Sequence, residues 1–320
     1  MAYKVLVPQT VDKSGLDYLR ELGCEIKMGS GIDRDTLKAE IADCEALYLR
    51  TAVIDREVLE AAGRLKVIAR YGVGVDNVDL VAAKQLGIWV VNSPVANITT
   101  VAEHTIGFII ACARNFYRGD LATRTGDFEF RNREIGFDLA GKTLGLLGLG
   151  KIGSEVARKA IHGLDMKVTA YDPYADKERI TEGIELLESR EDLFRTADFV
   201  SLHVPVTDET LEGVGAAEFK LMKQSAYLIN CGRGKLVREA ELVEALRSGE
   251  ISGAALDVFN PEPPADDNPL FSLDKVILSP HNAGLTQEAA VRLSMDAVRG
   301  IEDVMKGVQP KFPVVVPERE

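Results

Sequence analysis

The sequence has few cysteines, no long apolar run and no excess of positive charge. Its four cysteines are scattered, with no CxxC pair and no metal-ligand spacing: Cys24, Cys44, Cys112 and Cys231. The sequence therefore predicts no metal site and favours a reducing compartment. No apolar stretch is long enough to span a bilayer, and Met1 to Lys4 leads into a predicted strand rather than a signal peptide. We expect a cytoplasmic protein without a membrane partner.

The charge balance limits the possible partners. The formal net charge is −12 at pH 7 and no basic run occurs, which argues against nucleic acid or anionic membranes as partners. A length of 320 residues suits two domains. An acidic protein that binds an anion must use local basic groups, so individual arginines become candidates for such a site.

What the sequence does contain is a dinucleotide-binding pattern near its middle. An apolar run from Leu144 leads into Gly148-Leu149-Gly150-Lys151-Ile152-Gly153, and Asp172 follows nineteen residues later. Gly148 allows a tight turn, Gly150 lets the backbone approach a pyrophosphate, and Gly153 lets the next helix pack closely. Asp172 can accept hydrogen bonds from ribose hydroxyls and has no arginine beside it, so we expect NAD rather than NADP. A lone GxGxxG also occurs in ordinary turns, but here strand, glycines, helix and acid occur together.

Short β-rich runs alternate with amphipathic segments, which implies parallel sheets covered by helices on both faces. The first set of predicted strands is Lys4–Val7, Cys24–Lys27, Ala46–Leu49, Val67–Arg70 and Trp89–Val91. The second set is Thr143–Leu147, Lys167–Tyr171, Phe199–Leu202, Tyr227–Asn230, Gly253–Leu256 and Val276–Leu278. Six strands are the number of a full dinucleotide-binding sheet. We predict an α/β fold with two doubly wound parallel-sheet domains, the central one a Rossmann domain.

Helical segments and one irregular region complete the prediction. Asp33 and Asp79 are expected N-caps of two early helices. We expect a long buried helix from Thr99 to Tyr117 and a final helix from Thr286 to Lys306 that returns to the first domain. The segment from Arg118 to Leu139 is interpreted as an extended arm or loop.

Polar residues follow several strands of the second set, where open α/β sheets place their sites. Arg233 lies between two glycines and offers a planar fork for a carboxylate. Glu262 is restricted between two prolines, and His281 suits a general acid or base. Taken singly, Arg233 is about as well explained as a surface arginine in a turn, and Glu262 is better explained as a solvated loop acid. Further cofactor contacts are expected at other strand ends: His203, Val204, Pro205, Cys231 and Asp257. His104 and His162 are interpreted as structural.

Together these motifs resemble the D-isomer-specific 2-hydroxyacid dehydrogenase family over nearly the whole chain. The matching stretches are Tyr71–Asn77, Val101–His104, Gly148–Gly153, Leu202–Pro205, Leu228–Gly234, Ala255–Phe259 with Glu262-Pro263, and Ser279–His281. The resemblance implies that Arg233, Glu262 and His281 are catalytic and that NAD is the cofactor. It also implies a homodimer, with a substrate domain of residues 1–98 and 286–320 around an NAD-binding domain of residues 99–285.

Within the family the chain is most similar to the phosphoglycerate dehydrogenase branch, in a short form without a C-terminal regulatory domain. Two residues depart from the family pattern. Arg238 stands where an acid or asparagine is usual, and Asn282 stands where an apolar residue often follows the histidine. Neither is one of the three implied catalytic residues, but both weaken a claim about the substrate.

The resulting hypothesis is NAD-dependent interconversion of a small D-2-hydroxy acid and its 2-oxo acid. His281 would exchange a proton with the substrate oxygen while Glu262 orients the imidazole and favours its protonated form. Arg233 would bind the substrate carboxylate. The backbone amides of Val73 and Gly74 are a candidate second clamp. Arg50, at a strand end, is a candidate extra charge, although a surface arginine is as well supported.

Three alternatives remain open at this point. A glyoxylate or hydroxypyruvate reductase would use the same groups on an unphosphorylated acid. Formate oxidation is disfavoured, because it needs no proton donor paired with a carboxylate. An NAD-sensing scaffold or corepressor is the third alternative, because a fold does not fix a function.

Overall fold

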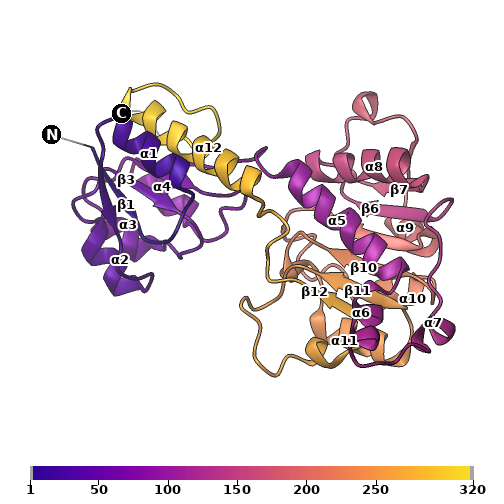
Figure 1. The fold of residues 1–320 in the computed structure, drawn as a ribbon. Coiled ribbons are helices and arrows are strands. Elements are labelled where there is room, and N and C mark those ends of the chain that lie inside the picture. Colours follow the sequence, from indigo (N-terminus) through magenta and orange to yellow (C-terminus); the bar gives the residue numbers. More distant parts are fainter. Residues whose placement is uncertain (1–2, 318–320) are drawn as a thin grey trace. The chain divides into compact units, whose positions relative to one another are not determined.

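The computed structural model describes residues 3–317, which form two compact units (Figure 1). Unit 1 is built from both ends of the chain, up to Asn97 and from Leu285 onward. Unit 2 is continuous and runs from Ile98 to Gly284. Among the described residues, no helix is long and apolar enough to cross a membrane.

Unit 1 is a six-stranded sheet between two layers of helices. Its strands are β1 (Lys4–Val7), β2 (Glu25–Met28), β3 (Ala46–Leu49), β4 (Val67–Arg70), β5 (Trp89–Val91) and β13 (Pro313–Val315). Its helices are α1 (Lys13–Glu21), α2 (Arg34–Ile41), α3 (Arg56–Ala61), α4 (Leu80–Gln85) and α12 (Gln287–Met305). The strand order is β13-β5-β4-β3-β1-β2, and only β13 is antiparallel to its neighbour. Side chains of α1 and α12 pack on one face, and those of α2, α3 and α4 pack on the other.

Unit 2 is a seven-stranded parallel sheet, also covered on both faces. Its strands are β6 (Thr143–Leu147), β7 (Lys167–Tyr171), β8 (Ile184–Leu186), β9 (Phe199–Leu202), β10 (Tyr227–Asn230), β11 (Gly253–Leu256) and β12 (Val276–Leu278). They lie in the order β12-β11-β10-β9-β6-β7-β8. The α-helices are α5 (Ile98–Ala113), α6 (Phe116–Arg124), α7 (Phe130–Arg133), α8 (Lys151–Leu164), α9 (Arg190–Thr196), α10 (Ala216–Leu221) and α11 (Glu239–Ser248). Short 3₁₀ helices are η1 (Lys177–Arg179), η2 (Gly234–Leu236) and η3 (Pro269–Ser272). One face is covered by α5 and α8, and the other by α9, α10 and α11.

The predicted aspartate caps are confirmed. Asp33 accepts a hydrogen bond from the amide of Thr36 at 3.0 Å, and Asp79 accepts one from the amide of Ala82 at 2.8 Å. Each bond satisfies one of the amides that a helix leaves unpaired in its first turn. The aspartates therefore fix where α2 and α4 begin.

Two strands were not predicted. β8 has three residues, of which the central Glu185 is exposed, so it is too short and too polar to resemble a strand of a buried parallel sheet. β13 begins at Pro313 and adds an antiparallel edge to the sheet of unit 1, a position where proline is tolerated. The sheet of unit 2 therefore has seven strands, one more than predicted.

The expected arm was wrong in its local structure. The segment from Arg118 to Leu139 contains most of α6 and all of α7 rather than an extended loop. The helix expected from Thr99 to Tyr117 ends at Ala113, because Asn115 has a left-handed backbone with φ 52°. Asparagine tolerates this conformation better than most residues, and the chain restarts there as α6.

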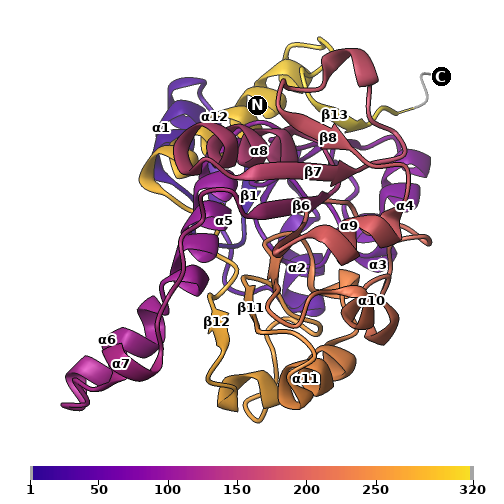
Figure 2. The ribbon, with the colours of Figure 1, turned by 90° about the vertical axis from the view of Figure 1, so that its right-hand side faces the viewer.

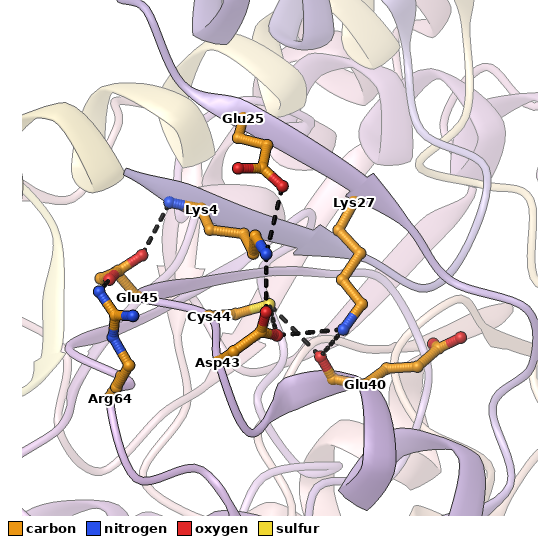
Figure 3. Close-up of polar contacts among 8 residues, drawn as sticks. All are labelled: Lys4, Glu25, Lys27, Glu40, Asp43, Cys44, Glu45 and Arg64. Carbon is orange, nitrogen blue, oxygen red and sulfur yellow. Dashed lines mark hydrogen bonds and ion pairs between the residues drawn. The ribbon is translucent and has the colours of Figure 1, made fainter. Parts of the chain in front are cut away.

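A cluster of ion pairs joins β1 and β2 to the loop before β3 in unit 1 (Figure 3). The ammonium of Lys4 lies 2.6 Å from Asp43 and 3.2 Å from Glu25, and that of Lys27 lies 3.1 Å from Asp43. Hydrogen bonds from Lys4 and Lys27 hold the pKa of Asp43 below its usual value. Asp43 therefore ties both strands to one loop.

We expect the Asp43 contribution to stability to depend on pH. Because its pKa is lower in the folded protein than in the unfolded chain, the carboxylate stabilises the fold above about pH 4. That contribution is lost as the pH falls through the folded-state value. Asp43→Asn should lower the melting temperature modestly at pH 7, since exposed ion pairs are weak. The difference from wild type should shrink in acid.

Circular-dichroism melts between about pH 3 and pH 7 measure this difference. Glu21→Gln is the control, because it removes the same charge from an exposed position for which no ion pair lies within residues 3–317. Equal behaviour of the two variants at every pH would show that the lysine contacts of Asp43 do not stabilise unit 1.

Candidate active site

The strand order of unit 2 creates a place for a ligand at the carboxyl ends of β6 and β9. From β6 the chain moves outward through β7 to β8, and it then returns to the other side of β6 with β9. Open α/β sheets bind their ligands where the strand order reverses in this way. The Gly148–Gly153 loop follows β6 and His203 follows β9, so both lie at this point.

The glycines of this loop have different physical roles. Gly148 has φ +98°, and a Cβ atom there would lie 2.7 Å from the carbonyl oxygen of His203. A Cβ at Gly153 would overlap the carbonyl oxygen of Gly148. A Cβ at Gly150 would have no atom within 4 Å, and Gly150 caps α8 without a side-chain hydrogen bond. The packing of the protein therefore requires two of these glycines, whereas Gly150 leaves open space at a helix N-terminus, which fits a pyrophosphate.

Asp172, at the end of β7, holds the loop from the side. One carboxylate oxygen accepts a hydrogen bond from the amide of Leu149 at 2.8 Å, and the other accepts one from the amide of Tyr174 at 2.9 Å. Lys151 and Ile152 follow as the first residues of α8. An ionised carboxylate has about four acceptor positions, so capacity remains for ribose hydroxyls. The bond to Leu149 was not anticipated from the sequence.

Residues after β9 and β10 present uncharged side chains at the same edge. Burial lowers the pKa of His203 to about 4, and its Nε2 lies 2.9 Å from the hydroxyl of Ser201. Burial raises the pKa of Cys231 to about 12, so its thiol stays protonated. Val204 is partly buried and Pro205 is exposed after His203. At neutral pH the side chains of His203 and Cys231 are therefore uncharged, and neither places a charge beside a bound dinucleotide.

The turn that carries Arg233 is organised by Asn230, the last residue of β10. The side-chain amide of Asn230 donates to the carbonyl oxygen of Arg233 at 2.9 Å, and its oxygen accepts from the amide of Gly232 at 3.0 Å. A Cβ at Gly234 would overlap the backbone of Phe259, so the loops after β10 and β11 touch backbone to backbone. Arg233 itself is partly buried. Sequence reasoning missed Asn230, although a polar residue ending a buried strand before a glycine was an available signal.

His281 and Glu262 form a pair. Nδ1 of His281 lies 2.7 Å from a carboxylate oxygen of Glu262, and the two side chains are 48% and 37% exposed. Because Glu262 occupies Nδ1, Nε2 remains for a substrate. His281 has φ 51°, a left-handed conformation that is uncommon for residues with a side chain and recurs at functional sites.

The three predicted catalytic residues follow three adjacent parallel strands. Arg233 comes after β10, Glu262 after β11 and His281 after β12. Neighbouring strands lie about 4.8 Å apart, so these strand ends span about 10 Å of one sheet edge. The arrangement combines an anion-binding guanidinium with a group able to transfer protons.

Asp257 anchors the loop that carries His281. It is buried, with a relative exposure of 1%. Its carboxylate accepts hydrogen bonds from the backbone amides of Asn282 and Ala283 at 2.9 Å each, and another from the hydroxyl of Ser279. The predicted contact of Asp257 with the cofactor stays a prediction.

The predicted substrate-binding residues Arg50, Val73 and Gly74 belong to unit 1. Arg50 follows β3 and is partly buried, and the other two lie in the turn after β4. The side chain of Asn92 donates to the carbonyl oxygen of Val73 at 2.7 Å and holds this turn. Within residues 3–317, no acceptor takes the amide hydrogens of Val73 and Gly74, so both can meet an anion.

Comparison with known proteins gives consistent results. The family described as "D-isomer specific 2-hydroxyacid dehydrogenase, NAD binding domain" matches residues 106–283. D-3-phosphoglycerate dehydrogenase from Archaeoglobus fulgidus is 40% identical over 319 residues, which are 99% of this chain and 60% of that protein. The chain spans about 60% of the length of such curated relatives.

Solved structures are similar over almost the whole chain. A protein from Thermus thermophilus has a TM-score of 0.91 and 36% identity, and the match covers 98% of this chain and 100% of that one. NAD-dependent formate dehydrogenase from Staphylococcus aureus, solved in complex with NAD, has a TM-score of 0.88 and 28% identity with the same coverage.

Gly150→Ala tests the glycine loop as the dinucleotide site. The added methyl group meets no protein atom within 4 Å, so the melting temperature should fall only slightly, because alanine is a weaker N-cap residue than glycine. It fills the space in front of α8, so NADH affinity should drop at least about tenfold, or about 1.4 kcal/mol. Fluorescence titration with NADH measures this drop.

Gly163→Ala is the matched control, because it lies on the same helix and its added Cβ also meets no atom within 4 Å. It should bind NADH as the wild type does. Unchanged NADH affinity in Gly150→Ala would show that the pyrophosphate does not bind at this loop.

Proposed function

Because the chain belongs to the D-isomer-specific 2-hydroxyacid dehydrogenase family, whose matched domain binds NAD, we propose that it interconverts a small D-2-hydroxy acid and its 2-oxo acid. The pair of His281 and Glu262, 2.7 Å apart, carries the proposal. A half-exposed imidazole fixed by a carboxylate is an arrangement suited to proton transfer.

Each of the three residues has a part in the reaction. NAD, when bound, supplies the hydride acceptor. Nε2 of His281 takes the hydroxyl proton during oxidation and returns it during reduction. Glu262 holds Nδ1, which directs Nε2 to the substrate and stabilises the positive charge of the imidazolium. Arg233 binds the carboxylate and polarises the oxygen on C2.

We propose 3-phosphoglycerate as the substrate. The support is 40% identity to D-3-phosphoglycerate dehydrogenases over nearly the whole chain, together with Arg50 as an extra positive charge in unit 1. The reductases of unphosphorylated 2-oxo acids remain the second candidate, since the same three residues serve them equally. Formate is disfavoured, because its oxidation removes no hydroxyl proton and gives the Glu262–His281 pair no task.

His281→Ala tests the reaction. Proton transfer by a positioned side chain contributes roughly 10² to 10⁴ in rate, so kcat should fall by about that factor while NADH affinity stays the same. Wild type and variant are assayed with 3-phosphoglycerate, glycerate, lactate, glycolate and formate side by side. His162→Ala, an exposed histidine on α8, is the control. A wild-type protein that binds NADH but neither oxidises any of these acids nor reduces hydroxypyruvate would support the scaffold alternative.

Arg233→Lys tests carboxylate binding. Lysine keeps the charge but offers a point donor in place of a planar fork, so a bidentate contact cannot be kept. KM for the acid should rise and kcat should fall together, because the contact acts on both the ground state and the transition state. Normal kinetics toward the acid with weakened NADH binding would move Arg233 into the cofactor site.

We also propose that the protein is a homodimer through α6 and α7, which extend away from the sheet of unit 2 (Figure 2). Large apolar side chains are exposed along this segment: Phe116 58%, Tyr117 55%, Leu121 52%, Phe128 64% and Ile135 80%. A cavity of about 500 Å³ lies beside it, lined in part by Phe130 and Phe271. Exposed apolar patches of this kind mark contact surfaces. Sedimentation velocity should give twice the chain mass of 34.9 kDa, and a monomer in solution would refute the dimer.

A cytoplasmic location is the last part of the proposal. All four cysteines are free thiols, and three of them are buried, which suits a reducing compartment. Cell fractionation tests this location, and recovery of the protein outside the cytoplasm would contradict it.

A further inference from the structure

His104 on α5 belongs to a polar network that ends at the loop after β12. Its Nε2 lies 3.1 Å from the hydroxyl oxygen of Ser279. The Ser279 hydroxyl donates to the buried carboxylate of Asp257, which also accepts the amides of Asn282 and Ala283. The network therefore runs from a helix on one face of the sheet to the carboxyl edge of β11 and β12.

The hydrogens that each side chain carries determine which group donates and which accepts in this network. Ser279 has one hydroxyl hydrogen and gives it to Asp257, whose ionised carboxylate can only accept. The oxygen of Ser279 can then only accept from His104, so Nε2 of His104 carries its hydrogen. His104 lies 3.9 Å from the nearest oxygen of Asp257, too far for a direct hydrogen bond.

The surroundings of His104 keep its ring neutral and in place. Burial lowers the pKa of His104, and the opposing attraction of Asp257 is smaller. A neutral imidazole has one N–H, and here that N–H is used on Ser279. The ring meets Phe108 edge to face, with centroids 4.4 Å apart at 73°. Phe108, one turn along α5, therefore restricts the ring orientation.

The loop after β12, at the other end of the network, needs hydrogen bonds that hold its backbone in place. His281 has φ 51°, and its amide donates to the carbonyl oxygen of Asp257 at 2.8 Å. A left-handed residue with a side chain persists only where the surrounding structure holds it. The bonds from Asp257 to the next two amides supply that hold, and Ser279 keeps the Asp257 carboxylate oriented.

We propose that His104 is a positioning residue for His281. It acts by donating to Ser279, which fixes Asp257 and thereby the backbone that aims the imidazole of His281. This inference rests on the proposed function, because the aim of His281 matters only if it exchanges a proton with the substrate. A misplacement of about 1 Å can cost on the order of 10²-fold in rate.

Two substitutions of His104 separate the hydrogen bond from packing. His104→Leu replaces the imidazole with an apolar side chain of similar size and removes the donor, so kcat should fall roughly 10- to 100-fold. NADH affinity should change far less than kcat, because the glycine loop and Asp172 are not part of the network. His104→Gln places an amide N–H where Nε2 stood and should recover most of the lost kcat. Ser279→Ala breaks the same link from the other side and serves as the second variant if His104→Leu does not fold.

A double-mutant cycle with His281→Ala gives the decisive readout. If His104 acts through His281, His104→Leu should lower kcat in the wild type and have no further effect on the residual rate of His281→Ala. An equal loss in both backgrounds would show that His104 only supports the fold. Wild-type kcat in His104→Leu, with His281→Ala impaired as expected, would overturn the inference and leave the proposed function standing. A wild-type protein that turns over no 2-hydroxy acid would overturn the proposed function, and the inference with it.

Discussion

The buried carboxylate of Asp257 imposes the constraint on which the candidate active site depends. A buried charge is costly unless donors surround it, and Asp257 meets this need with two amides and one hydroxyl from the segment between Ser279 and Ala283. The segment cannot move without leaving a charge unpaired. His281 lies in the middle of that segment. The hydrogen bonds to Asp257 therefore hold its left-handed backbone, and with it the imidazole that contacts Glu262, although Asp257 itself need not touch the substrate.

The Gly148–Gly153 loop of unit 2 is also held by a carboxylate at a strand end. Asp172 accepts the amide of Leu149, so a carboxylate at the end of β7 holds the loop after β6. Gly148 and Gly153 allow contacts that any Cβ would prevent, one against His203 and one within the loop itself. In both places an acid at a strand end fixes a neighbouring loop, and the loop then presents backbone or a side chain to a ligand. Parallel strands bring such loops to one edge, so few residues suffice to build the site.

The sequence predicted the elements whose signals are local. Apolar runs located the longer strands, aspartates located helix starts, and glycine spacing located the turn between β6 and α8. Two of the misses were elements that depend on tertiary contacts. β8 is a three-residue strand with an exposed glutamate, and β13 pairs with β5 from more than 200 residues away. The break between α5 and α6 was a local miss, because it lies at Asn115, which adopts a left-handed backbone. The role of His104 escaped for the same reason as β8 and β13, because it depends on which hydroxyl lies opposite in space. The role of Asn230 was missed although its bonds to Gly232 and Arg233 are local in the sequence.

The two departures from the family pattern can be weighed by the same reasoning. Arg238 is half exposed and lies 3.6 Å from Glu241 and 4.0 Å from Glu212, so its charge is balanced at the surface by ion pairs that contribute little to stability. Asn282 is exposed, and the contact that matters there is made by its backbone amide to Asp257. Any residue other than proline supplies that amide. Both positions can therefore vary while the hydrogen bonds that hold His281 are kept, so neither departure argues against the family's chemistry. In the proposed reaction, discrimination between one 2-hydroxy acid and another would rest with groups that bind the rest of the substrate, for which Arg50 and the turn at Val73 stay predictions.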